Sequence, residues 1–313
     1  MPYCLRLGDW SVLVCSGTPD VELLLSHTGH LLHSFLVHDD ELDKDITCLV
    51  IANPTLLGKS GYPEWLSKDQ YIVWDELCNS ITSTLCQTLP RRDAGLPFFR
   101  WLQPGYETID RVGASFAKRA HQLCFVFLCD EPGEYSHIQL FLYLLLLANK
   151  WHIRHRGFCL HSAAIARGHK GFLFLGGSRA GKTTVSQLST LTGYTALGDD
   201  LNFILRKEED YVLAAAPSAA ASMTCSKSRP CLQAIFNLVQ DKKDFLIPLS
   251  PMQIARSLFE GLGQAPKSAY LLNQELELAF QTCCAIARAI PGYELHFRKS
   301  PDFWKLIDEQ FPD

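Results

Sequence analysis

Eight residues in the middle of the chain have the types and spacing of a loop that binds nucleotide phosphates. They run from Gly176 to Thr183 (GGSRAGKT) and fit the P-loop, or Walker A, pattern G-x-x-x-x-G-K-[ST]. In such a loop, backbone N–H groups surround the phosphates, the lysine reaches the β- and γ-phosphates, and the final hydroxyl binds Mg²⁺. The pattern therefore predicts ATP and Mg²⁺ as cofactors. The expected nucleotide contacts are Gly176, Gly177, Ser178, Arg179, Ala180, Gly181, Lys182, Thr183 and Thr184.

An acidic pair follows at a distance that suits the same site. Asp199 comes 17 positions after Lys182, and Asp200 follows it directly. One helix and two turns fill this interval, so a right-handed β-α-β crossover makes the strand before the acids parallel to the strand before the loop. Its carboxyl end then returns to the edge where phosphates bind. We expect Asp199 to accept the proton of an attacking hydroxyl, and Asp200 to bind the metal together with Thr183, with the reverse assignment of the two acids left open.

A β-hairpin expected over residues 160–176 makes His161 a further catalytic candidate. If Ala166 pairs with Gly171 across the turn, His161 lies opposite Gly176 and beside the loop. The alternative is a histidine whose hydrogen bonds are satisfied locally at a strand end. Lys182 is the third catalytic candidate, because it is expected to reach the β- and γ-phosphates.

Hydrophobic periodicity and turn signals indicate the elements that would position these residues. In the second half, strands are expected at 171–175, 194–197, 233–239 and 293–298, and helices at about 137–151, 183–192, 251–261, 274–288 and 301–309. Ser300 is expected to cap the last helix, with Pro301 at its first position. In the first half, strands are expected at 3–7, 10–15, 30–37, 46–52 and 122–129, and helices at about 74–89 and 109–119.

A polar, Pro- and Gly-containing linker at 130–136 divides the sequence into two expected domains. Residues 1–135 are expected to form a smaller α+β domain whose role the sequence does not disclose. Residues 136–313 are expected to form an α/β nucleotide-binding domain with a mixed sheet.

Composition excludes several other classes of function. The chain has 313 residues, 47% of them hydrophobic and 20% charged, and its net charge is −4. Nucleic-acid and membrane-surface partners favour basic patches, so neither is expected. The most apolar run, Phe141–Ala148, is too short to span a bilayer, and the first residues lack a signal-peptide layout, which predicts a cytoplasmic protein. The twelve cysteines lack the spacing of a zinc site and are expected to be mostly small buried side chains.

Three segments together resemble the kinase domain of the HPr kinase/phosphorylase superfamily, which shares its nucleotide-binding fold with phosphoenolpyruvate carboxykinase. They are Leu160–Ile165, Gly176–Thr184 and Gly198–Asp200. The resemblance continues in Pro230–Phe236 and Ile290–Arg298. These parts are similar to the smaller HPr-kinase-like proteins of peptide-modification systems, such as lasso-peptide kinases and the SynChlorMet cassette protein ScmC.

The resemblance implies a P-loop serine kinase that transfers the γ-phosphoryl group of ATP to a peptide or protein. It also implies that His161 occupies the position of the family's histidine near the phosphates. Two residues depart from the family pattern, because Arg179 stands where the loop usually has glycine and Thr184 where HPr kinases carry an acid. The chain also lacks a Val-Arg-Pro-Gly-Arg-Asn-like stretch, so phosphorylase activity and HPr itself as substrate are not expected.

Two alternatives to a kinase remain at the level of sequence. One is a nucleotide-binding recognition module without turnover, which Arg179 favours. The other is a carboxykinase-like lyase, although no additional Lys/His set of metal ligands is evident. Candidates for the far side of the phosphates are Lys227, Arg229 and Arg298, and the first two lie in a segment, 224–230, that could close over ATP. For each of these three, a solvated surface residue is the alternative.

Overall fold

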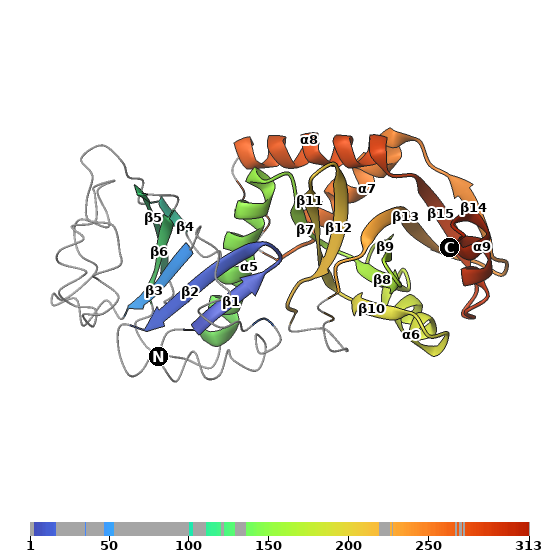
Figure 1. Cartoon of the computed structure of the whole chain (residues 1–313), viewed down its shortest axis with the longest axis horizontal. Helices are drawn as coiled ribbons and strands as arrows, with labels where there is room; N and C mark the ends of the chain where they lie inside the picture. The colour runs from blue at the N-terminus through green and yellow to red at the C-terminus, as the bar shows by residue number, and fades with distance from the viewer. Residues whose placement is uncertain are drawn as a thin grey trace. The chain divides into compact units, whose positions relative to one another are not determined.

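The computed structural model describes residues 3–16, 35, 47–52, 100–102, 111–119, 122–128, 136–218, 226, 228–266, 268, 271 and 273–312. The chain divides into two compact units, Met1–Leu144 and Leu145–Asp313. The division falls inside helix α5 (Ser136–Arg154), which is labelled in Figure 1.

The first unit contains a six-stranded sheet in the order β1-β2-β3-β6-β5-β4. Its strands are β1 (Tyr3–Leu7), β2 (Trp10–Ser16), β3 (Thr47–Ala52), β4 (Arg100–Leu102), β5 (Arg111–Arg119) and β6 (Gln122–Leu128). Strands β2, β3 and β6 run parallel, and the other neighbours are antiparallel. The expected hairpin at the start of the chain is confirmed, because Leu7 pairs with Trp10 across its turn.

One expectation for the first unit is wrong. The segment 109–119 was expected to be helical, but it contains strand β5, which pairs with β6. Its alanines favour a helix locally, but the backbone pairing of this segment with β6 outweighs that preference. The helix expected at 74–89 lies outside the described residues, and of the strand expected at 30–37 only Phe35 is described.

The second unit is a mixed sheet covered by helices (Figure 1). Its strands are β7 (Phe158–His161), β8 (Ala163–Arg167), β9 (Lys170–Leu175), β10 (Thr195–Gly198), β11 (Leu201–Lys207), β12 (Asp210–Ala215), β13 (Cys231–Gln240), β14 (Phe245–Pro248) and β15 (Gly292–Phe297). Besides α5, its helices are α6 (Lys182–Leu191), α7 (Pro251–Gly263), α8 (Asn273–Ala289) and α9 (Phe303–Gln310). Hydrogen bonds give the order β10-β8-β9-β13-β12-β11-β7, and β15 also pairs with β13 and β14.

Very short connections join strands that lie near opposite ends of this order, namely β7 to β8 and β10 to β11. Only Ser162 separates β7 from β8, and only Asp199 and Asp200 separate β10 from β11. Strand β8 pairs antiparallel with β10, and β7 pairs antiparallel with β11. Between them the N–H of Ser162 donates to the carbonyl oxygen of Asp200 at 2.9 Å. Residues 158–167 and 195–207 thus form one long antiparallel ladder. It is interrupted at Ser162 on one side and at Asp199 and Asp200 on the other.

Side-chain alternation on β13 separates the two faces of the sheet. Phe236 and Leu238 belong to a buried core formed with α6 and α9, whereas the intervening Asn237 donates to Ser257 of α7 at 2.7 Å. Trp304 of α9 packs against the aromatic rings of this core, and its indole N–H donates to the Ser189 hydroxyl at 2.9 Å. Helix α9 is therefore tied to α6 by apolar packing and by a buried hydrogen bond.

Helix α9 begins later than expected. Asp302, not Ser300, stands at the N-cap, and the first helical residue is Phe303. Residues 301 and 302 form a turn instead, because the N–H groups of Trp304 and Lys305 bond three residues back. The Ser300 hydroxyl still donates to the Asp302 carboxylate, at 2.6 Å.

We predict that Trp304→Ala lowers the free energy of unfolding by about 3–5 kcal/mol, because it removes a large buried side chain. Trp304→Phe, which mainly removes the hydrogen bond to Ser189, should cost about 1 kcal/mol. Met252 is 68% exposed, and Met252→Ala should change stability by less than about 0.5 kcal/mol. Urea denaturation measures all three, and similar losses for Trp304→Ala and Met252→Ala would contradict the assignment of this core.

Candidate functional site

A glycine-rich loop, residues 176–181, leaves the sheet where three parallel strands end. Strands β9, β13 and β15 run parallel, and their last residues are Leu175, Gln240 and Phe297. The Gln240 side chain donates to the carbonyl oxygen of Arg179 at 2.8 Å. Loops beyond the carboxyl ends of parallel strands are the usual place for ligands in α/β sheets.

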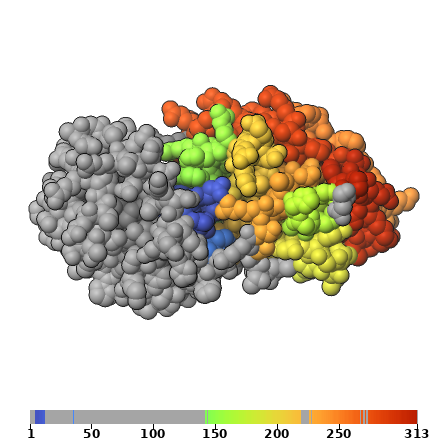
Figure 2. Space-filling view, viewed as in Figure 1, coloured from blue at the N-terminus to red at the C-terminus, as the bar shows by residue number. Residues whose placement is uncertain are grey.

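The last glycine of the loop is required by close packing. Gly181 has φ 112°, and a Cβ at this position would lie 2.7 Å from the ring of Phe297. Its carbonyl oxygen accepts the first bond of α6, from the N–H of Val185 at 2.8 Å. The unbonded N–H groups of the first turn of α6 therefore lie beside the loop, where an anion is favoured. Part of α6, in the yellow region of Figure 2, is exposed at the surface of this unit.

Arg179 occupies the loop in a left-handed conformation, with φ 66°. This conformation costs a non-glycine residue about 1–2 kcal/mol. It explains why glycine is usual here, and shows that the arginine does not prevent the loop from forming. Its side chain is exposed.

Lys182 is the first residue of α6 and is buried, with only 6% of its surface exposed. Its ammonium group donates to the carbonyl oxygens of Gly176 at 2.7 Å and Gly177 at 3.1 Å. Burial lowers the pKa of Lys182, and the negative charge of Asp200 opposes this shift. The lysine and the second acid are thus close enough to interact electrostatically.

Asp200 is the centre of a polar cluster that comes from four parts of the chain. Its carboxylate contacts the Nε2 atom of His161 at 3.2 Å and accepts a hydrogen bond from the Ser218 hydroxyl. The Nδ1 atom of His161 contacts the side-chain oxygen of Gln264, just after α7, at 3.0 Å. The hydrogen bond with His161, together with Ser218 and the charge of Lys182, lowers the pKa of Asp200 despite its partial burial.

Asp199 lies directly after β10 and is 4% exposed, so it is more buried than its neighbour. The N–H of Ser226 donates to the carbonyl oxygen of Leu197 at 3.3 Å, which brings that residue of the 224–230 segment beside the end of β10. Thr183 is exposed on the first turn of α6. The expected direction of β10 is confirmed, since β8 is antiparallel to both β9 and β10, although β8 separates them.

The expected pairing of His161 is wrong. Ala166 does pair with Gly171, but the hairpin begins only at Ala163. The chain leaves this hairpin at Ser162, and His161 pairs with Leu201 of β11 instead of lying opposite Gly176. The histidine nevertheless contacts Asp200, through the β7–β11 ladder.

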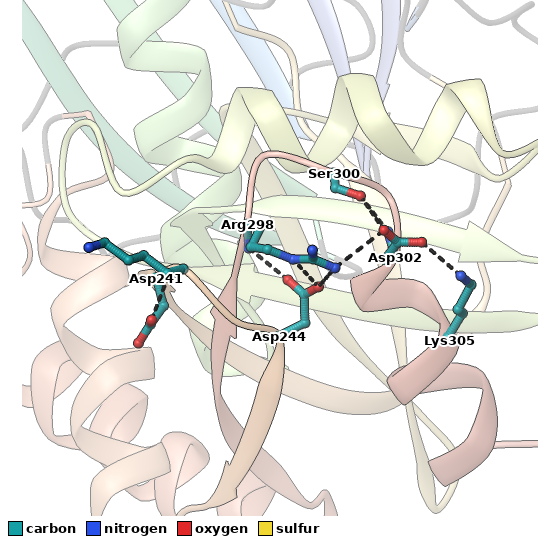
Figure 3. A network of polar contacts seen from close by, with 7 residues as sticks. Asp241, Asp244, Arg298, Ser300, Asp302 and Lys305 are labelled. Carbon is teal, nitrogen blue, oxygen red and sulfur yellow. Dashed lines mark hydrogen bonds and ion pairs between the residues drawn. The ribbon is translucent and has the colours of Figure 1, made fainter.

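Arg298, one of the expected phosphate-binding cations, is held in a network of acids (Figure 3). Its guanidinium contacts the carboxylates of Asp244 at 2.7 Å and Asp302 at 3.3 Å, and Asp302 also pairs with Lys305. The positive charge of Arg298 is therefore balanced within the protein. Arg229 is exposed just before β13, and Lys227 lies outside the described residues.

Sequence reasoning missed Ser218, Gln264 and Asn202. Ser218 contacts Asp200, and Gln264 contacts His161. Both lie in loops that carry no recognisable motif. Asn202 lies two residues after the acidic pair and donates to the backbone of Ser162 and Gly198. Only its closeness in sequence to Asp200 could have drawn attention to it.

Metal-binding groups, membrane-spanning helices and cysteines can be described only for the part of the chain that the structure covers. This part has no group of three or more His, Cys, Asp or Glu side chains arranged to hold a metal ion. None of its helices is long and apolar enough to cross a bilayer. Of the four cysteines whose burial the structure describes, Cys159 and Cys283 are buried, whereas Cys231 and Cys284 are only partly buried, so the expectation of mostly buried cysteines is met for two of the four.

Fold and site together define an α/β protein whose mixed sheet carries a glycine-rich loop, a buried lysine and an acidic pair. Residues 128–312 match the model of the family described as SynChlorMet cassette protein ScmC. The chain belongs to this family, which confirms the resemblance inferred from the sequence.

A solved structure, the Hpr(Ser) kinase/phosphatase from Coxiella burnetii, is similar at 18% sequence identity with a TM-score of 0.23. The match covers 30% of this chain and 71% of that one. No curated protein matches the sequence.

The close contact at Gly181 gives a prediction that compares two glycines with positive φ. Gly168, at φ 58°, has open space around a Cβ, so Gly168→Ala should cost only the backbone strain of about 1–2 kcal/mol. Gly181→Ala should cost at least about 1 kcal/mol more, because the new methyl group displaces Phe297 or the loop. Thermal and urea denaturation of both variants measure the difference, and equal losses would contradict the packing described here.

Proposed function

We propose that this protein is an ATP- and Mg²⁺-dependent kinase that transfers the γ-phosphoryl group to a serine hydroxyl of a peptide or protein. One observation carries the proposal: Lys182 is buried at the glycine-rich loop, within electrostatic reach of Asp200. A buried ammonium group is costly unless anions neutralise it. Phosphates bound by the loop would supply such charge, and phosphoryl transfer depends chiefly on positioning and charge neutralisation.

In this proposal the loop and the first turn of α6 hold the β- and γ-phosphates through backbone N–H groups and Lys182. Asp199 accepts the proton of the serine hydroxyl as it attacks. His161 contacts Asp200 and holds that carboxylate in place. Ser226 bonds the carbonyl oxygen of Leu197, two residues before Asp199, and the 224–230 segment to which it belongs could exclude water that competes with the hydroxyl.

The residues present fit a magnesium ion in their chemistry. The Thr183 hydroxyl and the Asp200 carboxylate are oxygen donors, the type that Mg²⁺ prefers, and both side chains are accessible from solvent. The hydrogen bonds that lower the pKa of Asp200 keep it in the charged form that a metal requires. A bound Mg²⁺ would neutralise charge on the phosphates.

The choice of a peptide or protein acceptor rests on the resemblance to HPr-kinase-like proteins of peptide-modification systems. The proposed role in peptide natural-product modification rests on the same resemblance. The same resemblance supports serine as the acceptor residue.

Incubation of the protein with [γ-³²P]ATP, Mg²⁺ and serine-containing peptides tests the function directly. We expect label on a serine peptide and the loss of both nucleotide binding and transfer in Lys182→Ala. Lys242→Ala, which removes an exposed lysine outside the glycine-rich loop, serves as the control. Tight nucleotide binding without transfer to any acceptor would contradict the kinase and support a recognition module.

Separate variants of the two acids test their assigned roles. Asp199→Asn should retain ATP binding but lower the transfer rate by about 10²–10⁴-fold, because the base is lost. Asp200→Asn should instead raise the Mg²⁺ concentration needed for half-maximal rate. His161→Ala should be milder than either. Near-normal transfer by Asp199→Asn would show that this residue is not the base.

A further inference from the structure

Asn202 joins the two places at which the long antiparallel ladder is interrupted. Its side-chain NH₂ group donates to the carbonyl oxygen of Ser162 at 2.8 Å, to the Ser162 hydroxyl at 3.1 Å and to the carbonyl oxygen of Gly198 at 3.2 Å. Both Asn202 and Ser162 are fully buried. One side chain on β11 therefore holds the β7–β8 junction and the end of β10 together.

Gly198 allows this arrangement because it has no side chain. A Cβ at this position would lie 2.8 Å from the side-chain oxygen of Asn202 and 3.0 Å from the carbonyl oxygen of Leu201. Such a contact is too short for any real Cβ, so the chain before the acids can approach Asn202 only as glycine.

Each residue that Asn202 binds is adjacent to a residue of the candidate site. Ser162 follows His161, and its N–H donates to the carbonyl oxygen of Asp200 at 2.9 Å. Gly198 precedes Asp199. His161 Nε2 lies 3.2 Å from the Asp200 carboxylate. A shift of either junction would therefore change the distance between the histidine and the acidic pair.

We propose that Asn202 is a positioning residue for phosphoryl transfer, which fixes the acidic pair against His161 through Ser162 and Gly198. This inference rests on the proposed kinase function. The side chain of Asn202 bonds Ser162 and Gly198 and has no assigned role in binding the phosphates. It acts through the backbone, so its loss should impair transfer more than nucleotide binding, since small misplacements of reacting groups slow chemistry strongly.

The test compares Asn202→Ala with Asn149→Ala in the full chain. Asn149 is also buried, but its side-chain oxygen accepts a bond from the Cys159 N–H at 2.8 Å, within strand β7 and not at Ser162 or Gly198. Both variants should lose stability. Asn202→Ala alone should lower kcat with Mg²⁺ and ATP by about 10–100-fold, while KM for ATP stays within about threefold.

Amide hydrogen exchange supplies a readout that does not depend on activity. The peptide that contains Ser162 should lose protection in Asn202→Ala, because its N–H bond to Asp200 is no longer supported. If Asn202→Ala exchanges faster at the Ser162 peptide but keeps its kcat, Asn202 has only a structural role and the inference is overturned. Unchanged exchange at this peptide would overturn it as well. Turnover by the wild type is measured first and tests the kinase proposal by itself.

Gly198→Ala provides a second variant in case Asn202→Ala does not fold. Its methyl group should push Asn202 aside and produce the same selective loss in kcat. Because the shortest contact is with the Asn202 side chain, the two substitutions should be less than additive in the double variant. Full additivity would show that Gly198 and Asn202 act independently, against the inference.

Discussion

The arrangement of the second unit depends on placing negative charge near a buried ammonium group. Lys182 lies under the glycine-rich loop with loop carbonyl oxygens as its hydrogen-bond partners. Carbonyl dipoles offset only part of the cost of burying a charge. The negative charge of Asp200 offsets a further part of this cost. The contacts of Asp200 with His161 and Ser218 hold its carboxylate in place.

Parallel and antiparallel strand pairs in the same sheet place the lysine-bearing loop and the acids. Parallel strands β9, β13 and β15 bring the loop, Gln240 and Phe297 to one edge. The antiparallel ladder then carries the acids and His161 on segments that are firmly paired on either side of their interruption. The residues of the candidate site thus lie at or beside breaks in regular structure, and each break is flanked by paired strands.

The sequence was most informative where local chemistry determines structure. The loop, its following helix and the strand pattern around them needed only the motif and the periodicity of apolar residues, and the Ala166–Gly171 pairing was confirmed. The position of His161 could not be predicted, because the chain leaves the hairpin at Ser162, whose bonding partner Asn202 lies 40 residues later in the chain. The strand at 111–119 was missed for a similar reason, since pairing with β6 outweighed a local preference for helix. Arg298 has the right charge for a phosphate, but its partner Asp244 lies 54 residues away in the chain.

The pairing of β13 with β15 has a consequence for the order of folding. Ile235 lies beside Gly292 in this parallel pair, so a segment that contains α7 and α8 must be closed before the two strands meet. Contacts between residues so far apart in sequence carry a large entropic cost and form slowly. The β8–β9 hairpin needs no such closure. The edge that bears Phe297, against which the glycine-rich loop packs, is therefore expected to assemble after the hairpin that leads into that loop.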